Sequence, residues 1–414
     1  AMKLHWFHLM PYPDLPDDFK EKHRSVWVDV DSRLFDPVRG HEVYNEYLDE
    51  LEYAADMGFD GICVNEHHQN AYGLMPSPNI MAAALSRRAT KPAIIVLGNS
   101  IALYNPPVRV AEEFAMLDCI TGGRLVAGFP VGTSMDTNFA YGQTPITLRE
   151  KYQEAHDLIL RAWTDPDPFV WNGKYNQLRY VNIWPRPLQK PHPPIWIPGG
   201  GSIETWEWVT ERGYLYAYLS YFGYKRGQSV MNGFWNQVEK MGVEPNPYRA
   251  GFLQLAAVSE TDAQAEEDYS EAANYFYERC LHVYNGFADA PGYRTMRTLE
   301  AGIMAQVGAQ AAAVRRDLTW KDYVEQGYIV AGSPESVTEQ LREVIKGLRV
   351  GHLMMLLQFG NMPRDKVMKN TRLFAEKVMP NLRDLWPEWE DHWWIKPLPE
   401  SRRARPGEAK VAAK

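Results

Sequence analysis

The segment Gly58-Phe59-Asp60-Gly61-Ile62-Cys63-Val64-Asn65-Glu66-His67-His68 carries the pattern that decides the fold. Its apolar part, residues 59–64, predicts a short strand, and the polar tetrad Asn65 to His68 follows directly after it. Short continuous apolar runs are typical of strands that are covered on both faces, as in parallel sheets. Gly58 stands where a preceding helical stripe ends, the position at which a left-handed residue is favoured.

The same alternation of apolar runs and helical periods continues along the chain. Seven further runs predict strands, at residues 4–9, 93–97, 125–129, 195–197, 214–219, 252–258 and 352–357. Because parallel neighbours need a crossover connection, strands separated by helices predict a parallel sheet. The count of strands favours a closed (β/α)₈ TIM barrel over an open sheet.

The 414 residues exceed what a minimal barrel needs. We predict one barrel domain over residues 1–395, enlarged by insertions at about 164–194 and 262–330. Residues 396–414 contain six basic and two acidic side chains without an apolar period, which predicts a flexible basic tail.

Composition excludes several classes of protein. Lysine and arginine total 44 against 52 acidic residues, a net charge of −8 that argues against nucleic-acid and anionic-membrane surfaces. No apolar run is long enough to span a bilayer, and the amino-terminal residues lack the pattern of a secretory signal. Three cysteines without metal-type spacing predict neither a disulfide framework nor a zinc site, so we expect a reduced, cytoplasmic protein.

Functional residues of such a barrel gather at the carboxyl ends of its strands. Four predicted strands end in polar or glycine-rich segments: Asn65-Glu66-His67-His68, Gly98-Asn99-Ser100, Pro130-Val131-Gly132 and Pro198-Gly199-Gly200-Gly201-Ser202. We expect these segments to converge on one face of the barrel.

The glycine run ending in Ser202 predicts an anion site. Glycine lets the backbone approach a ligand, and the free N–H groups of the following helix favour a phosphate. Thr205, one turn into that helix, adds a hydroxyl, and Arg149 adds a charge-assisted contact. The alternative is a flexible turn in which Ser202 is an ordinary helix cap.

Adjacent His67 and His68 suggest a metal site at first sight, but neighbouring side chains on an extended segment point in opposite directions and no third ligand is near. We therefore predict no metal. One imidazole at the barrel mouth suits proton transfer, since its ordinary pKa lies near neutrality. The alternative is that both histidines have only a structural role. We expect Glu66 to orient a neighbouring side chain or to bind a backbone amide.

Other catalytic motifs are missing from the sequence. It contains no G-x-S-x-G nucleophile elbow, no P-loop and no G-x-G-x-x-G fingerprint, which argues against serine hydrolases, ATP-binding proteins and Rossmann-type NAD enzymes.

Taken in order, the motifs resemble those of the bacterial luciferase-like flavin monooxygenase family, over about residues 3–382. The segments that carry the resemblance are residues 58–68, Asn105-Pro106-Pro107-Val108-Arg109 with Glu112-Glu113 and Leu117-Asp118, Gly122-Gly123-Arg124-Leu125, Gly200-Gly201-Ser202 with Glu207-Trp208, and Gly332-Ser333-Pro334-Glu335 with His352-Leu353.

The resemblance implies an enzyme that binds reduced FMN, forms a flavin hydroperoxide with O₂ and oxygenates a small organic substrate, with a separate NAD(P)H:flavin reductase as partner. His67 matches the family's catalytic histidine. Asn99 matches a flavin-binding position, with a cis peptide expected between Gly98 and Asn99. The phosphate-contacting positions are matched by Arg149, Gly200, Gly201, Ser202 and Thr205.

Val131 stands where luciferase itself has a second phosphate-binding arginine, so the aldehyde substrate and light emission are not expected here. Two alternatives share the barrel: an F420-dependent dehydrogenase or reductase, and a non-catalytic flavin-binding protein. The resemblance also implies a homodimer or higher oligomer, with the helices around residues 44–55 and 80–85 as interface elements. The loop after the first strand, residues 164–194 and a lid at 262–321 are expected to form the substrate pocket.

Overall fold

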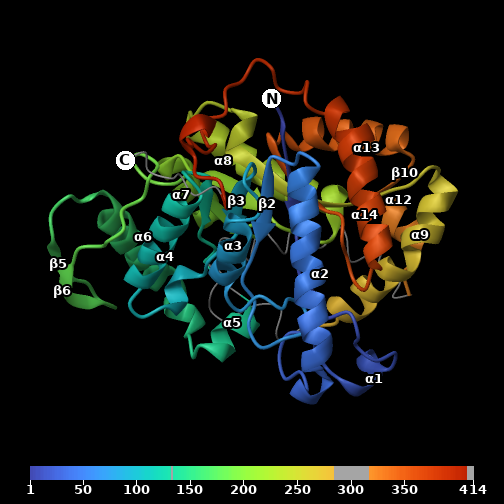
Figure 1. Cartoon of the computed structure of the whole chain (residues 1–414), viewed down its shortest axis with the longest axis horizontal. Coiled ribbons are helices and arrows are strands. Elements are labelled where there is room, and N and C mark those ends of the chain that lie inside the picture. The colour runs from blue at the N-terminus through green and yellow to red at the C-terminus, as the bar shows by residue number, and fades with distance from the viewer. Residues whose placement is uncertain (132–133, 284–316, 408–414) are drawn as a thin grey trace.

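A computed structural model describes residues 1–131, 134–283 and 317–407 of the chain. Its centre is a closed barrel of eight parallel strands (Figure 1). These strands are β1 (Lys3–Phe7), β2 (Gly61–Val64), β3 (Ala93–Val96), β4 (Leu125–Gly128), β7 (Ile195–Gly199), β8 (Leu215–Tyr218), β9 (Ala250–Val258) and β11 (His352–Leu356). The barrel closes because β1 pairs with both β2 and β11 while β8 pairs with β9. The predicted (β/α)₈ barrel is confirmed.

The strands are short and almost wholly buried, which explains their continuous apolar runs. Every residue of β2, β3, β4, β9 and β11 is buried. A further strand, β10 (Ile329–Gly332), was not predicted; it extends the sheet along β9, where Leu255 pairs with Ile329 on one edge and Leu356 on the other. Four residues are too few for periodicity to distinguish a strand from the start of the helix that follows.

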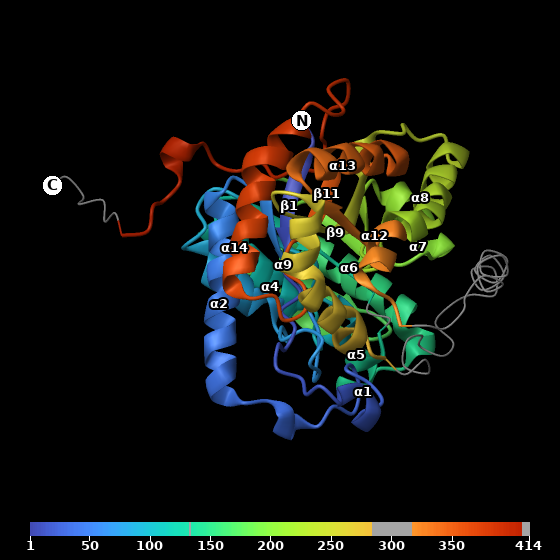
Figure 2. The ribbon, with the colours of Figure 1, turned by 90° about the vertical axis from the view of Figure 1, so that its right-hand side faces the viewer.

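Helices cover the outside of the barrel on all sides (Figures 1 and 2). The long ones are α2 (Pro37–Asp56), α3 (Pro78–Ser86), α4 (Val108–Ile120), α6 (Leu148–Thr164), α7 (Ile203–Arg212), α8 (Gly223–Lys240), α9 (Asp262–Tyr275), α13 (Pro334–Leu348) and α14 (Arg364–Leu373). The short ones are α1 (Phe19–Lys22), α5 (Met135–Ala140) and α12 (Trp320–Glu325). Gly58 follows α2 at φ +92°, a conformation that side chains rarely adopt, as its position in the sequence predicted. None of the described helices is both long and apolar enough to cross a bilayer.

The predicted insertions leave the barrel at two places. Residues 164–194 carry a two-stranded hairpin, β5 (Phe169–Asn172) and β6 (Gln177–Val181), which stands at the edge of the molecule (Figure 1). The insertion at 262–330 opens with α9, and residues 284–316 lie outside the described part of the chain.

The start of the predicted flexible tail contacts the rest of the protein. Lys396 N donates to Gln189 Oε1 at 2.8 Å, and Leu398 N donates to Gly122 O at 2.9 Å. The last described residues extend away from the barrel (Figure 2).

The amino-terminal end of the barrel is closed by aromatic residues from the end of the chain. Trp196 Nε1 donates to Trp393 O at 3.0 Å, and Trp394 stacks on His5 with ring centroids 5.3 Å apart. His5 in turn faces His352, with Nε2 3.0 Å from Nδ1. Because this end is filled, the space for a ligand lies at the carboxyl ends of the strands.

Candidate active site

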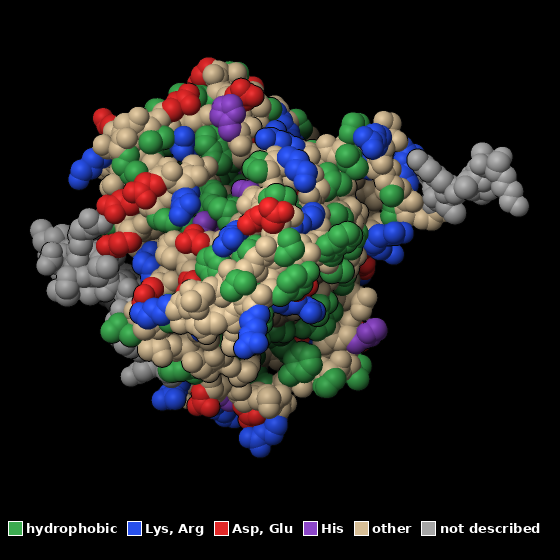
Figure 3. All heavy atoms as spheres, turned by 90° about the vertical axis from the view of Figure 1, so that its left-hand side faces the viewer, with side chains coloured by type: hydrophobic (Ala, Val, Ile, Leu, Met, Phe, Trp, Pro, Cys, Tyr) green, Lys and Arg blue, Asp and Glu red, His purple; other side chains and the backbone are tan. Residues whose placement is uncertain are grey.

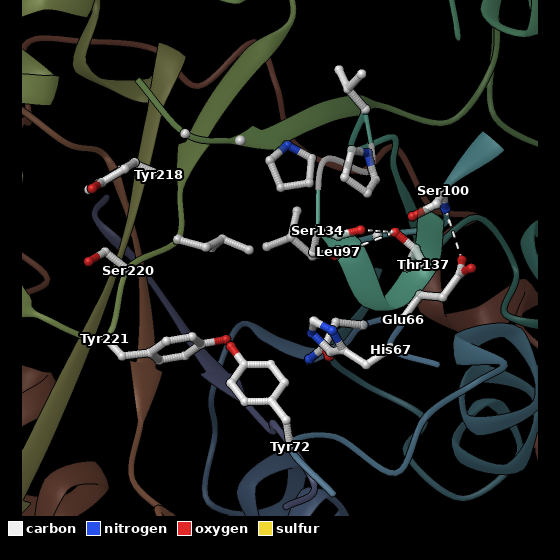
Figure 4. Close-up of a pocket in the computed structure, with 18 of the residues that line it drawn as sticks. Glu66, His67, Tyr72, Leu97, Ser100, Ser134, Thr137, Tyr218, Ser220 and Tyr221 are labelled. Atoms are coloured by element: carbon white, nitrogen blue, oxygen red, sulfur yellow. Dashed lines mark hydrogen bonds between the residues drawn. The ribbon is translucent and has the colours of Figure 1, made fainter. Parts of the chain in front are cut away.

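One cavity of about 680 Å³ lies at the carboxyl ends of the barrel strands (Figure 4). All four segments that the sequence singled out contribute to it, so their predicted convergence is confirmed. The residues that line it from these segments are Asn65, Glu66, His67, Gly98, Ser100, Pro130, Val131, Pro198, Gly199, Gly200, Gly201 and Ser202. The volume is in the range of pockets that hold cofactors or small organic ligands.

His67 presents its imidazole to the cavity, where the side chain is 19 % exposed. Its Nδ1 lies 3.5 Å from Oδ2 of Asp136, a carboxylate that is only 1 % exposed. Because Nδ1 faces the carboxylate, Nε2 is the ring nitrogen available to a bound ligand. An imidazole held in this way is suited to donate or accept a proton at Nε2.

Asp136 was not among the predicted site residues. Burial alone would raise the pKa of its carboxyl, but the hydrogen bond and charge of His67, with donors from Ser134 and the His68 backbone, hold this pKa below its ordinary value. Asn70 Nδ2 also donates to Oδ2, at 3.0 Å. The carboxylate therefore stays ionised beside the imidazole. It lies in the six-residue helix α5, where no local pattern marks it as functional.

Both carboxylate oxygens of Glu66 bind neighbouring groups, including a backbone amide, as predicted. Its Oε1 accepts from Asn99 Nδ2 at 2.7 Å and from Ser100 N at 2.9 Å, a contact visible in Figure 4. Its Oε2 lies 2.6 Å from His68 Nε2 and accepts from Tyr104 OH at 3.2 Å. His67 and His68 thus have different carboxylate partners, and Glu66 ties the segment after β2 to the segment after β3.

The structure places Asn99 behind the cavity wall, where it is 1 % exposed and does not line the cavity. Its amide donates to Glu66, and its Oδ1 accepts from Asn79 Nδ2 at 2.9 Å. Direct contact of this side chain with a cofactor stays a prediction.

The prediction of a cis peptide between Gly98 and Asn99 is wrong by one residue, because the cis bond joins Leu97 to Gly98. Gly98 is the position of closest approach to β4. A Cβ there would lie 2.5 Å from both Gly128 O and Pro130 Cδ. A side chain at this position would therefore clash with β4 and with Pro130, a contact that local sequence does not reveal.

The other end of the cavity holds the predicted anion cradle, which is formed by Arg149, Ser202 and Thr205. Arg149 donates from Nη2 to Ser202 Oγ at 3.1 Å and from Nη1 to Thr205 Oγ1 at 3.4 Å. The Ser202 hydroxyl makes no cap bond to its helix; it donates to Glu204 Oε2 at 3.1 Å, so the ordinary-cap alternative does not hold. A Cβ on Gly200 would have no heavy atom within 4 Å, which leaves open space at the start of α7.

Arg149 stands behind the two hydroxyls rather than on the cavity surface. Val131, which stands where luciferase has a second phosphate-binding arginine, lines the cavity. The described lining residues include no lysine or arginine. The cradle therefore combines one guanidinium, two hydroxyls and the backbone at the start of α7.

The lining of the cavity fits FMN. The cradle at the mouth of α7 supplies donors of the kind that bind a phosphate, and the wall formed by Leu97, Gly98, Pro130 and Val131 is apolar, as a flat ring requires. The barrel thus brings an arginine–hydroxyl cluster and an imidazole–carboxylate pair to one cavity.

Comparison with known proteins gives the family. Residues 26–350 match the luciferase-like monooxygenase family, so the chain belongs to it. The oxygenase component of flavin-dependent trigonelline monooxygenase from Acinetobacter baylyi is 25 % identical over 295 residues, 70 % of this chain and 77 % of that protein. The family assignment confirms the resemblance drawn from the sequence.

Solved structures share the fold. The oxygenating constituent of 3,6-diketocamphane monooxygenase from Pseudomonas putida, in complex with FMN, has a TM-score of 0.69 at 17 % identity and covers 92 % of this chain and 98 % of its own. An F420-dependent secondary alcohol dehydrogenase has a TM-score of 0.64 at 17 % identity and covers 92 % and 99 %. Both flavin and deazaflavin enzymes thus use this barrel.

Proposed function

We propose that this protein is a monooxygenase that uses reduced FMN and O₂ to oxygenate a small organic substrate. The observation that carries the proposal is that Ser202 and Thr205 of the predicted cradle line the same cavity as His67, which pairs with Asp136. A binding protein would need the cradle alone, because storage requires no proton-transfer group.

In this proposal the phosphate of FMN is bound by Arg149, Ser202 and Thr205, with Gly200 and Gly201 allowing close approach of the backbone. The apolar wall around Gly98 and Val131 receives the ring. Glu66 holds that wall in place through Asn99 and the Ser100 backbone.

Bound reduced FMN would supply the electrons that activate O₂. His67 holds or moves a proton at Nε2, and Asp136 stabilises the protonated imidazole and fixes its orientation. The aromatic side chains Trp27, Tyr72 and Tyr221 exclude water from the cavity beside His67.

We further propose that a separate NAD(P)H:flavin reductase supplies the reduced FMN. The sequence holds no dinucleotide-binding fingerprint, and the trigonelline relative is described as an oxygenase component. Reduced flavin would then reach the cavity from solution as a co-substrate.

A rapid-mixing experiment tests the proposal. The protein is loaded with reduced FMN without O₂ and mixed with oxygenated buffer, and flavin reoxidation is followed by absorbance in wild type and His67→Ala. We expect the protein to slow reoxidation relative to free reduced FMN, and the substitution to change that rate. Identical rates in wild type and variant would indicate a flavin-binding protein. If the protein binds F420 in preference to FMN and transfers hydride without O₂, it is an F420-dependent dehydrogenase or reductase and the proposal is wrong.

For the oligomer we propose a homodimer through α3 and α4. The two helices pack side by side, and they expose Ile80 (66 %), Met116 (50 %) and Ile120 (47 %). Figure 3 shows hydrophobic side chains at several places on the left-hand side of the molecule as drawn in Figure 1. Exposed apolar side chains clustered on a surface mark contact sites. Of the two helices expected at the interface, this favours the one around residues 80–85.

A further inference from the structure

Two tyrosines meet across the substrate end of the cavity. Tyr72 follows the polar segment after β2, and Tyr221 lies between β8 and α8. Figure 4 shows the two rings pointing toward one another beside His67, with their hydroxyl groups facing each other. The barrel thus brings together two loops that are 149 positions apart in the sequence, so that two hydroxyl groups meet among aromatic side chains.

Both rings are held in place by contacts outside the pair. Tyr72 is 2 % exposed and stands edge-on to His67, with centroids 4.7 Å apart, and to Trp27 at 5.3 Å. Its backbone N–H donates to Asn70 Oδ1 at 3.1 Å. Tyr221 packs edge-on against Phe276 at 5.6 Å, and its carbonyl accepts from Tyr277 OH at 2.6 Å. The hydroxyl pair is therefore preorganised.

The pair has at least one hydroxyl proton available to a ligand. Two phenols carry two protons, and a hydrogen bond between them would use only one. Trp27 adds an indole N–H that is buried and without a partner among the described residues. This end of the cavity is consequently rich in donors.

Charge at this end is sparse. The described lining residues include no lysine or arginine, and the one lining carboxylate, Glu66, is already satisfied by four polar contacts. Phe7, Leu281 and Val283 complete the wall with apolar surface. An anionic group here would lose its hydration and would meet no lysine or arginine among the described lining residues.

We propose that the Tyr72–Tyr221 pair is the recognition element for a neutral, flat organic substrate. A carbonyl-type oxygen of this substrate accepts a hydrogen bond from one of the two hydroxyl groups, beside His67. The proposal rests on the function proposed above for the reaction that follows, but the recognition itself needs no cofactor. Trp27, Tyr72 and Tyr221 line this end of the cavity, and aromatic surface of this kind suits a flat molecule.

Calorimetric titration of the full chain, with and without oxidised FMN, tests this recognition. The probes are 2-acetylnaphthalene, which carries a neutral carbonyl, 2-isopropenylnaphthalene, which has the same shape without the oxygen, and 2-naphthoate, which is anionic. We expect the ketone to bind about fivefold to tenfold more tightly than the hydrocarbon, the effect of one hydrogen bond, and the anion most weakly. Tyr221→Phe and Tyr72→Phe should each remove most of the preference for the ketone.

Tyr180→Phe is the matched control, since Tyr180 is exposed on β6 and outside the cavity. Thermal unfolding and FMN affinity of each variant report whether the fold and the cradle are intact. Equal binding of ketone and hydrocarbon to wild type, no measurable ketone binding, tighter binding of naphthoate, or a preference that survives both substitutions would overturn the proposal. A protein that shows the ketone preference but does not react with O₂ in the presence of reduced FMN would refute the monooxygenase and leave the recognition element standing.

Discussion

His67 and Asp136 form an imidazole–carboxylate pair across the mouth of the barrel, with Nδ1 3.5 Å from Oδ2. One partner follows β2 and the other lies in α5 after β4, so the pair exists only in the folded chain. The carboxylate is buried and receives the His68 backbone N–H at 3.2 Å as well. This arrangement fixes which ring nitrogen faces the cavity.

Replacement of Asp136 by Asn should alter flavin chemistry without preventing binding. The amide cannot stabilise a protonated imidazole, so we expect the His67-dependent rate of flavin reoxidation to change about tenfold to hundredfold. FMN affinity, measured by flavin fluorescence, should stay within about twofold because the cradle lies elsewhere. Since the two residues act as a unit, Asp136→Asn should add little in a His67→Ala background. Independent, additive effects would contradict this pairing.

Replacement of Arg149 by Ala should weaken binding of the phosphate. Removal of a charge-assisted contact of about 1.5–3 kcal/mol corresponds to a loss of roughly tenfold to hundredfold in FMN affinity. Riboflavin lacks the phosphate and serves as the matched ligand, because its affinity should not change. Titrations of wild type and variant with both ligands measure the difference. An equal loss for riboflavin would show that Arg149 acts through the fold.

Acidic substitutions on α3 and α4 should dissociate the proposed dimer. Ile80→Glu combined with Met116→Glu places charges on the exposed apolar face, where burial in an interface would be costly. Light scattering should then report the mass of a monomer. Val38→Glu is the control, since Val38 is 70 % exposed at the start of α2. A monomeric wild type, or a dimer that persists in the double variant, would exclude this interface.

His8 should make stability fall in acid. Burial lowers its pKa from 6.5 to about 3 in the folded protein, and its Nδ1 accepts from Met10 N at 2.9 Å. The unfolded chain binds the proton below pH 6.5 while the folded protein does not, so stability is full above that pH and declines toward about pH 3. The difference in unfolding free energy between wild type and His8→Gln should fall by about 1.4 kcal/mol per pH unit in this window.

Urea unfolding at several pH values measures that difference. Glu50, which faces His8 Nε2 at 3.4 Å, has a pKa raised by burial and is present in both proteins, so its own titration largely cancels. A constant difference between pH 6.5 and pH 4 would mean that His8 is protonated in the fold.

Gly98→Ala should destabilise the protein. The added methyl would lie 2.5 Å from Gly128 O at the end of β4 and from Pro130 Cδ just after it, and overpacking of this kind costs about 1–3 kcal/mol. Gly200→Ala is the matched control, because no heavy atom lies within 4 Å of a Cβ there. Urea unfolding should separate the two variants, and equal stability would show that β4 moves aside.

The sequence by itself determined the barrel and the segments at its mouth. Continuous apolar runs such as residues 59–64 predict buried parallel strands, because both faces of the strand are covered. The glycine run before Ser202 and the tetrad ending in His68 follow strands directly, so local order was enough to place them at the carboxyl end. Glycine placement likewise predicted the left-handed residue at Gly58.

Tertiary structure alone decided which side chains meet. Asp136 reaches His67, and Tyr221 reaches Tyr72, only because the closed barrel brings the ends of non-adjacent strands within a few ångströms. Asn99 lies behind the wall, where its buried amide donates to Glu66, and the cis peptide joins Leu97 to Gly98 rather than Gly98 to Asn99. Periodicity reports which face of an element is buried, whereas hydrogen-bond partners across a barrel depend on strand order and closure, which no local pattern contains.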